Sequence, residues 1–186
     1  RKVSEMLKVP VERQRRMMAI RKPRSPMRVV MKAFLAASAA ERLAAQEKVD
    51  AVLGPYASGT TIAAAPVLEK YKVPMITGSA ESPLIWKQKF RYTFGTIPPA
   101  NFTGAAVIKV LAALPQGPKT AVIYGSNDTF SKATAEAFQA TAEQLGIKVL
   151  RFNILPPKQD MTPLMSAAKV LNPDLVAFGG HDEELV

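Results

Sequence analysis

Small hydroxyl residues at the start of a predicted helix are the part of this sequence best suited to chemistry. Ser58, Gly59 and Thr60 follow a short apolar run at residues 49–53 and precede an alanine-rich segment. A helix that begins here presents unpaired backbone N–H groups and a serine hydroxyl, which together suit a carboxylate. Charge-assisted hydrogen bonds of this kind contribute about 1.5–3 kcal/mol each. The alternative is that Ser58 or Thr60 serves only as a helix cap.

Residue types for catalysis or metal binding are scarce. The chain has no cysteine and one histidine, His181, which excludes a disulfide framework, a thiolate metal site and a histidine cluster. There is no Gly-x-Ser-x-Gly nucleophile motif and no phosphate-binding glycine motif. Asp182, Glu183 and Glu184 could serve acid–base or metal chemistry, but at a helix start such acids more often complement the helix dipole. We therefore expect no enzyme activity, no cofactor and no metal.

The positive charge is concentrated at the N-terminus. The net charge is +10, and residues 1–32 alone hold eleven Lys and Arg against two acids, so the remainder is almost neutral. Residues 1–32 lack the interleaved aromatic residues of a nucleic-acid platform, and Lys32 interrupts the apolar run that a signal peptide over residues 27–40 would need. We treat residues 1–32 as an anomalous basic leader, with a cloning, frame or truncation artefact or a partly disordered lead-in as the favoured interpretation. No stretch approaches the ~20 apolar residues of a membrane-spanning helix.

Strands and helices alternate along the rest of the chain. Helical spacing predicts helices over residues 33–48, 61–71, 83–87, 101–114, 131–145 and 161–171. Pro66 should break or kink the second of these, and Asn101 or Thr103 should cap the fourth. Apolar runs predict strands over residues 51–53, 72–76, 91–94, 119–124, 147–153 and 175–178. Without hairpin signals, this order favours an α/β class with parallel, doubly wound sheets.

Four of the predicted strands are followed by loops of small polar residues. These loops cover residues 54–61, 77–82, 125–130 and 179–182. Ligands of such sheets bind beyond the carboxyl ends of the strands. The sequence therefore predicts a binding site shared by these loops.

Five ordered segments carry a family resemblance. They are VDAVLGPYASGTT, VPMITGSAESP, FRYTFGTIPPANFTGAA, KTAVIYGSNDTFSKATAEAFQATAEQLGIKV and NPDLVAFGGHDEE. Together they resemble the substrate-binding proteins of branched-chain amino-acid (Leu/Ile/Val) ABC transporters. The resemblance implies the type I periplasmic binding-protein fold, in which two Rossmann-like lobes joined by a hinge close over a small ligand. It implies a partial first lobe over residues 33–118 and a partial second lobe over residues 119–186, so that the fold is incomplete at both ends.

The resemblance also implies ligand contacts. Ser58 matches the serine that binds the ligand carboxylate, while Ala80 and Glu81 fall where the family commonly has an alanine and a threonine that hold carboxylate and ammonium groups. Phe130 stands where the family usually has a tyrosine, and His181 occupies another aromatic position. Because Glu81, Phe130 and His181 depart from the family pattern, strict Leu/Ile/Val specificity is not expected. The complete candidate set is Ser58, Gly59, Thr60, Ser79, Ala80, Glu81, Phe130 and His181.

These observations favour a non-enzymatic solute-binding protein located in the periplasm or otherwise outside the cytoplasm, either free or lipid-anchored. It would capture an amino acid or a similar small polar ligand between two lobes and present it to the membrane permease of an ABC transporter. One alternative is a ligand-sensing receptor of the same fold for amides, urea or aromatic acids. A third hypothesis, association of residues 1–32 with nucleic acid or an anionic membrane, is less favoured, and we expect no nucleic-acid partner.

Overall fold

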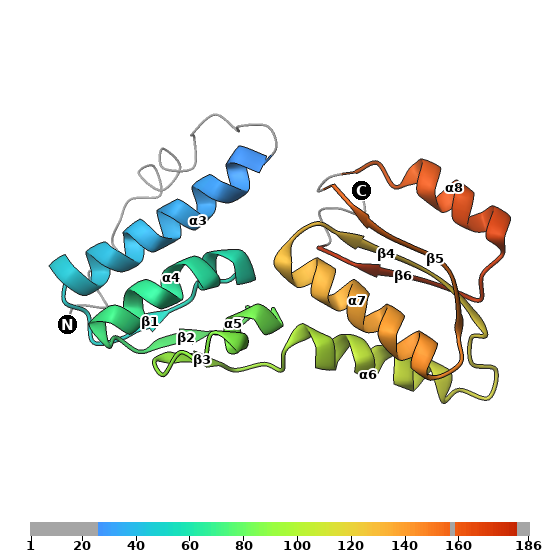
Figure 1. Cartoon of the computed structure of the whole chain (residues 1–186), viewed down its shortest axis with the longest axis horizontal. Helices are drawn as coiled ribbons and strands as arrows, with labels where there is room; N and C mark the ends of the chain where they lie inside the picture. Colours follow the sequence, from blue (N-terminus) through green and yellow to red (C-terminus); the bar gives the residue numbers. More distant parts are fainter. Residues whose placement is uncertain (1–25, 157–158, 182–186) are drawn as a thin grey trace, which may run out of the picture.

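Two parallel sheets form the framework of the protein in a computed structural model that describes residues 26–156 and 159–181. The first sheet has the order β1-β2-β3, with β1 (Val52–Leu53), β2 (Met75–Thr77) and β3 (Thr93–Gly95). The second has the order β5-β4-β6, with β4 (Thr120–Ser126), β5 (Lys148–Leu155) and β6 (Leu175–Gly179). All of the described strand pairs are parallel, which confirms the predicted α/β class. Figure 1 shows the two sheets in separate halves of the molecule.

Alanine-rich helices cover the first sheet. The helix α3 (Pro26–Glu41) continues into a π-helical turn, η1 (Arg42–Gln46), and packs against α4 (Ser58–Tyr71). The short α5 (Pro83–Lys87) follows β2. The buried residues of this half are mostly small, which allows the two long helices to approach closely. They are Ala40, Ala44, Ala64, Ala65, Leu68, Val73 and Met75.

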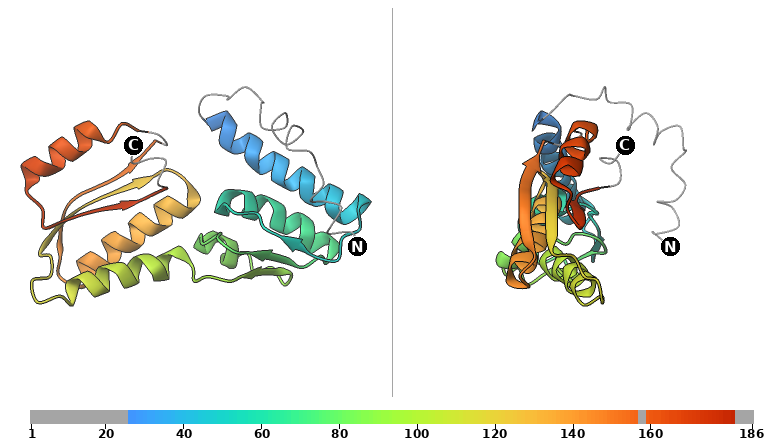
Figure 2. Two further views of the ribbon diagram at one scale, coloured as in Figure 1. Left: turned by 180° about the vertical axis from the view of Figure 1, so that it is seen from behind. Right: turned by 90° about the vertical axis from the view of Figure 1, so that its right-hand side faces the viewer.

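Helices lie on both faces of the second sheet. The helices α6 (Ala100–Ala112) and α7 (Thr129–Gln144) pack on one face, and α8 (Thr162–Leu171) packs on the other (Figure 2). The central strand β4 is buried from Ala121 to Ser126 and turns alternate side chains to the two faces. Ala121 and Ile123 lie in the core beneath α6 and α7, whereas Val122 and Tyr124 lie beneath α8. The predicted strand at residues 119–124 contains an unbroken apolar run at residues 121–124 because β4 is buried on both of its faces.

Several helix boundaries differ from the predicted ones. Helix α3 begins at Pro26, inside the segment that the sequence assigned to the leader, and α4 begins at Ser58 rather than at residue 61. Helix α4 also continues through Pro66 to Tyr71, so the predicted early break is wrong. Pro66 lies on the exposed side of the helix. The basic residues of 1–25 and the acids at 182–184 lie outside the described residues.

Helix α6 departs furthest from the sequence prediction. Its N-cap position is Pro99, so the proposed caps Asn101 and Thr103 are wrong. Its residue Ile108 is fully buried and belongs to the same hydrophobic cluster as Ile123 of β4 and Phe138 of α7. Helix α6 therefore packs with the second sheet, whereas the sequence assigned residues up to 118 to the first lobe.

Candidate functional site

The Ser58 hydroxyl accepts two backbone hydrogen bonds at the start of α4. Ser58 is the first residue of the helix and is 4% exposed. Its Oγ accepts the backbone N–H of Glu81 at 3.2 Å and that of Ser82 at 3.0 Å. A hydroxyl has two acceptor lone pairs and one proton, so both acceptor positions are occupied. No hydrogen bond within the described part of the chain uses the proton.

The backbone at the start of α4 adds further donors. The N-cap residue Ala57 offers no side-chain acceptor, and the first N–H to bond within the helix is that of Thr61, to the Ala57 carbonyl at 3.0 Å. The N–H groups of Ser58, Gly59 and Thr60 precede it and have no intrahelical acceptor. The Thr60 hydroxyl donates to the Ala57 carbonyl at 2.7 Å. This helix end combines N–H donors with the positive end of the helix dipole, which favours an anion.

The turn after β2 is braced against the loop after β1. Thr77 Oγ1 donates to the Pro55 carbonyl at 2.9 Å and accepts the Ala80 N–H at 3.0 Å. Ala80 is 1% exposed, and because its N–H is used, its carbonyl is the backbone group that could meet a ligand ammonium. Ser79 is half-buried in the same turn. Sequence reasoning did not select Thr77; the available signal was a hydroxyl at a strand end before Gly78.

The side chain of Glu81 contacts α6. Its Oε2 accepts the Thr103 hydroxyl at 3.2 Å, and Glu81 is half-buried. The sequence treated Glu81 as a candidate partner for a ligand ammonium or amide. The structure places a protein hydroxyl within hydrogen-bond distance of this carboxylate, and the same hydroxyl lies 3.1 Å from the Ala100 carbonyl.

The start of α7 presents a carboxylate and two aromatic rings, in contrast to the hydrogen-bond donors at the start of α4. Asp128 caps this helix, and its Oδ1 accepts the N–H of Phe130 at 3.0 Å and that of Ser131 at 3.1 Å. His181 Nε2 lies 3.8 Å from the same oxygen. The rings of Phe130 and His181 have centroids 5.3 Å apart. Sequence reasoning missed Asp128, although an aspartate just before a helix is a recognised cap signal.

The starts of α4 and α7 face each other. A Cβ atom placed on Gly59 would lie 3.9 Å from Thr129 Oγ1, the nearest side-chain atom. The ribbon views show α4 in one half of the molecule and α7 in the other, with their neighbouring ends facing each other (Figures 1 and 2). The structure thus brings the first turns of α4 and α7 close together at Gly59 and Thr129, which are far apart in the sequence.

The described residues contain no group of three His, Asp or Glu side chains that could hold a metal. In residues 26–156 and 159–181, no helix is both long and apolar enough to cross a bilayer.

The groups at the start of α4 are hydrogen-bond donors, whereas those at the start of α7 are a carboxylate and an aromatic pair. This arrangement suits non-covalent binding of a small molecule that has an anionic end.

A family model described as periplasmic binding protein matches residues 31–185. An amino acid binding protein from Pseudomonas aeruginosa is 27% identical over 150 residues, which are 80% of this chain and 40% of that protein. The chain therefore spans about two fifths of the length of this curated relative.

Solved structures show the same fold. The leucine-binding protein LivK from Thermotoga maritima is 32% identical with a TM-score of 0.68, and the match covers 77% of this chain and 41% of that one. A solute-binding protein of an ABC transporter from Rhodopseudomonas palustris, in complex with p-hydroxybenzoic acid, is 27% identical with a TM-score of 0.71. That match covers 78% of this chain and 39% of the other.

Proposed function

The chain belongs to the periplasmic binding protein family, and on that premise we propose that it is the extracytoplasmic solute-binding component of an ABC transporter. The ligand is an amino acid or a similar small polar molecule with a carboxylate. The two lobes capture it and present it to a membrane permease. Its relatives are solute-binding proteins rather than enzymes.

The observation that supports this proposal is the pair of backbone hydrogen bonds that the Ser58 oxygen accepts. Because these bonds occupy the oxygen, the hydroxyl can meet a ligand only as a donor. The backbone N–H groups of Ser58, Gly59 and Thr60 have no side-chain cap and add three hydrogen-bond donors at the same end of α4. A carboxylate uses all of these donors, whereas an ammonium group can use none of them.

The other end of the ligand meets the second lobe. Asp128 supplies a negative charge there. Phe130 supplies an apolar ring, and His181 supplies a polar one. An amino acid would place its carboxylate at α4 and its ammonium group towards Asp128. A ligand that bridges both lobes makes more contacts when they are close together, and this difference in contacts favours closure.

An aromatic acid is the second candidate ligand. The Phe130 and His181 rings favour it because an aromatic ligand can stack or make edge contacts there. A relative of similar structure is described in complex with p-hydroxybenzoic acid. Such a ligand has the same carboxylate for α4 but no ammonium group for Asp128.

Isothermal titration calorimetry tests the proposal with the protein that carries this chain. The panel contains leucine, isoleucine, valine, benzoate, 4-hydroxybenzoate, acetamide and urea. We expect binding of a carboxylate ligand that weakens by roughly 10- to 150-fold in Ser58→Ala, the equivalent of one charge-assisted hydrogen bond. The matched control is Ser166→Ala on α8, because the Ser166 hydroxyl bonds only to its own helix.

Three outcomes would count against this function. They are no heat with any member of the panel, an isotherm unchanged by Ser58→Ala, and binding restricted to acetamide or urea. The last would favour the amide or urea sensor instead. Circular dichroism of each variant separates loss of binding from loss of folding.

A further inference from the structure

Glu81 makes three contacts at the junction of the two lobes. Its backbone N–H donates to Ser58 Oγ at 3.2 Å, and its carbonyl accepts the Ala100 N–H at 2.8 Å. Its side-chain Oε2 lies 3.2 Å from the Thr103 hydroxyl, whose single proton is shared with the Ala100 carbonyl at 3.1 Å. Glu81 therefore links the Ser58 hydroxyl, which we propose binds the ligand carboxylate, with the first turn of α6.

Helix α6 begins without a cap of its own. Its N-cap residue Pro99 makes no side-chain capping hydrogen bond, and its first turn contains no acidic residue. The Glu81 carboxylate supplies the negative charge that stabilises the start of a helix, and the Glu81 carbonyl takes one of its free N–H groups. The start of α6 thus depends on a residue of the first lobe.

The rest of α6 belongs to the second lobe. Ile108 is fully buried in the core formed with β4 and α7. A Cβ atom added to Gly104 would lie 3.1 Å from the Ala137 Cβ, so α6 and α7 pack closely. A displacement of α6 therefore carries α7 with it. The first residue of α7, Thr129, is the one that faces Gly59 of the first lobe.

We propose that Glu81 is a positioning residue that fixes the orientation of the second lobe relative to Ser58 through its hydrogen bond to Thr103. In this role Glu81 does not contact the ligand. Glu81 sets the equilibrium between open and closed arrangements of the two lobes. Its loss would therefore change the affinity for every ligand by the same factor. The inference rests on the proposed function, since it concerns closure of the lobes over a solute.

Distance measurements without ligand test this role directly. The 186 residues contain no cysteine, so the exposed Arg91 and Lys169, on opposite lobes, can be changed to cysteine and spin-labelled. Double electron–electron resonance of the protein that carries this chain then reports the distribution of distances between the lobes. We expect Glu81→Ala and Thr103→Val each to broaden it, and the double variant to broaden it no further than Glu81→Ala alone.

Thr134→Val is the matched control. It makes the same chemical change on α7, where the Thr134 hydroxyl bonds only to the Phe130 carbonyl of its own helix, and we expect no broadening. Thr103→Val keeps the shape of the side chain, so the test remains informative if Glu81→Ala fails to fold. An unchanged distribution in Thr103→Val overturns the proposal, as does broadening in Thr103→Val without broadening in a folded Glu81→Ala variant.

Calorimetry adds a second readout. We expect the variants Glu81→Ala and Thr103→Val to weaken all bound members of the ligand panel by the same factor and to preserve their rank order. A changed rank order in Glu81→Ala would mean that the carboxylate contacts the ligand, and the proposal would be wrong. Because the distances are measured without ligand, failure to bind any solute counts against the proposed function and not against this coupling.

Discussion

The rings of Phe130 and His181 lie with their centroids 5.3 Å apart and are inclined by 36°. Phe130 belongs to the first turn of α7, which follows β4, and His181 follows β6, the neighbour of β4 in the sheet. Both residues therefore stand at the carboxyl edge of the second sheet. His181 Nε2 also lies 3.8 Å from Asp128 Oδ1. This edge of the second sheet thus presents an aromatic pair beside a carboxylate.

Removing the Phe130 ring should weaken ligand binding. Aromatic contacts of this geometry contribute about 0.5–1.5 kcal/mol, so we expect Phe130→Ala to lower affinity by roughly 2- to 12-fold. Phe130→Tyr keeps the ring and should retain most of the affinity. Calorimetry with the bound member of the panel gives the measurement. The control is Phe102→Ala on α6, whose ring is 64% exposed, and equal affinities for both alanine variants would refute the prediction.

The carboxylate of Asp174 should make stability depend on acid pH. Its Oδ2 accepts the Lys119 N–H at 2.8 Å, the Thr120 N–H at 2.9 Å and the Thr120 hydroxyl at 3.0 Å. The Lys119 N–H, followed by the two Thr120 groups, lowers the pKa of Asp174. A carboxyl whose pKa is lower in the folded state contributes stability above its unfolded pKa of about 4 and loses it as pH falls through the folded pKa.

We therefore expect Asp174→Asn to be less stable than the wild type at pH 7 and to approach it as the pH falls below about 4. Urea unfolding at a series of pH values between neutral and strongly acidic measures the difference. Glu136→Gln, which removes an exposed ion pair with Lys132, should change stability little at any pH. A difference between Asp174→Asn and wild type that stayed constant with pH would contradict the assignment.

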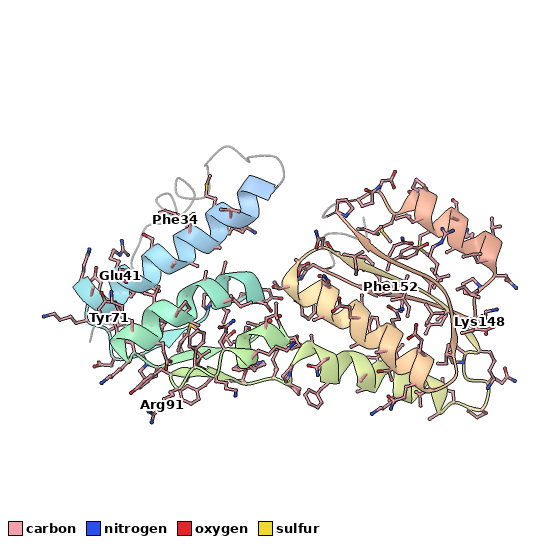
Figure 3. The ribbon with its side chains drawn as sticks, in the orientation of Figure 1. Phe34, Glu41, Tyr71, Arg91, Lys148 and Phe152 are labelled. Carbon is pink, nitrogen blue, oxygen red and sulfur yellow. The ribbon has the colours of Figure 1, made fainter. Side chains whose placement is uncertain are left out.

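The Tyr71 hydroxyl should contribute to the packing of α3 on α4. It donates to Glu41, and Figure 3 shows these two residues side by side at the ends of the helices. We expect Tyr71→Phe to lower the free energy of unfolding by about 0.5–1.5 kcal/mol, the usual net contribution of a hydrogen bond. Thermal or urea unfolding measures it.

Lys70 provides the comparison for Tyr71. Its Nζ lies 3.6 Å from Glu41 Oε1, and both side chains are largely exposed. Exposed ion pairs contribute little because solvent screens them, so Lys70→Gln should be close to neutral. A loss in Lys70→Gln as large as that in Tyr71→Phe would show that charge rather than the hydroxyl joins the helices.

One face of the first sheet should bind hydrophobic dyes. Leu53, Ile76 and Phe94 are neighbours across its three strands and are 83%, 38% and 51% exposed. Both faces of a parallel sheet are ordinarily covered, and exposed apolar patches promote association. We expect the Leu53→Thr/Ile76→Thr double variant of the 186-residue chain to bind less dye and to self-associate less, without loss of stability.

Dye fluorescence and analytical ultracentrifugation measure these two effects. The contrasting variant is Met75→Thr, because Met75 is fully buried on the opposite face of β2. Burial of an unpaired hydroxyl there should destabilise the fold strongly. Dye binding that did not change in the double variant would show that the patch is not the binding surface.

The alternation of strands and helices, and the order of these elements, could be predicted from the sequence alone. These features depend on local signals, namely apolar periodicity, glycine and proline positions, and caps. The helix α5 shows how well such signals work, since Ser82 caps it, Pro83 begins it, and it ends at Lys87 as predicted. Ser58 could be selected in the same way, as a hydroxyl next to a predicted helix start.

The contacts of Ser58 and Glu81 could not be predicted from the sequence and became visible in the folded chain. The Ser58 oxygen is occupied by N–H groups 23 and 24 residues away, and the Glu81 carboxylate is bonded to Thr103 on a helix that packs with the other sheet. Neither contact has a local signal, because each depends on how separate elements pack together. The same packing occupies the Ser58 oxygen with two N–H groups and places the Thr103 hydroxyl 3.2 Å from the Glu81 carboxylate.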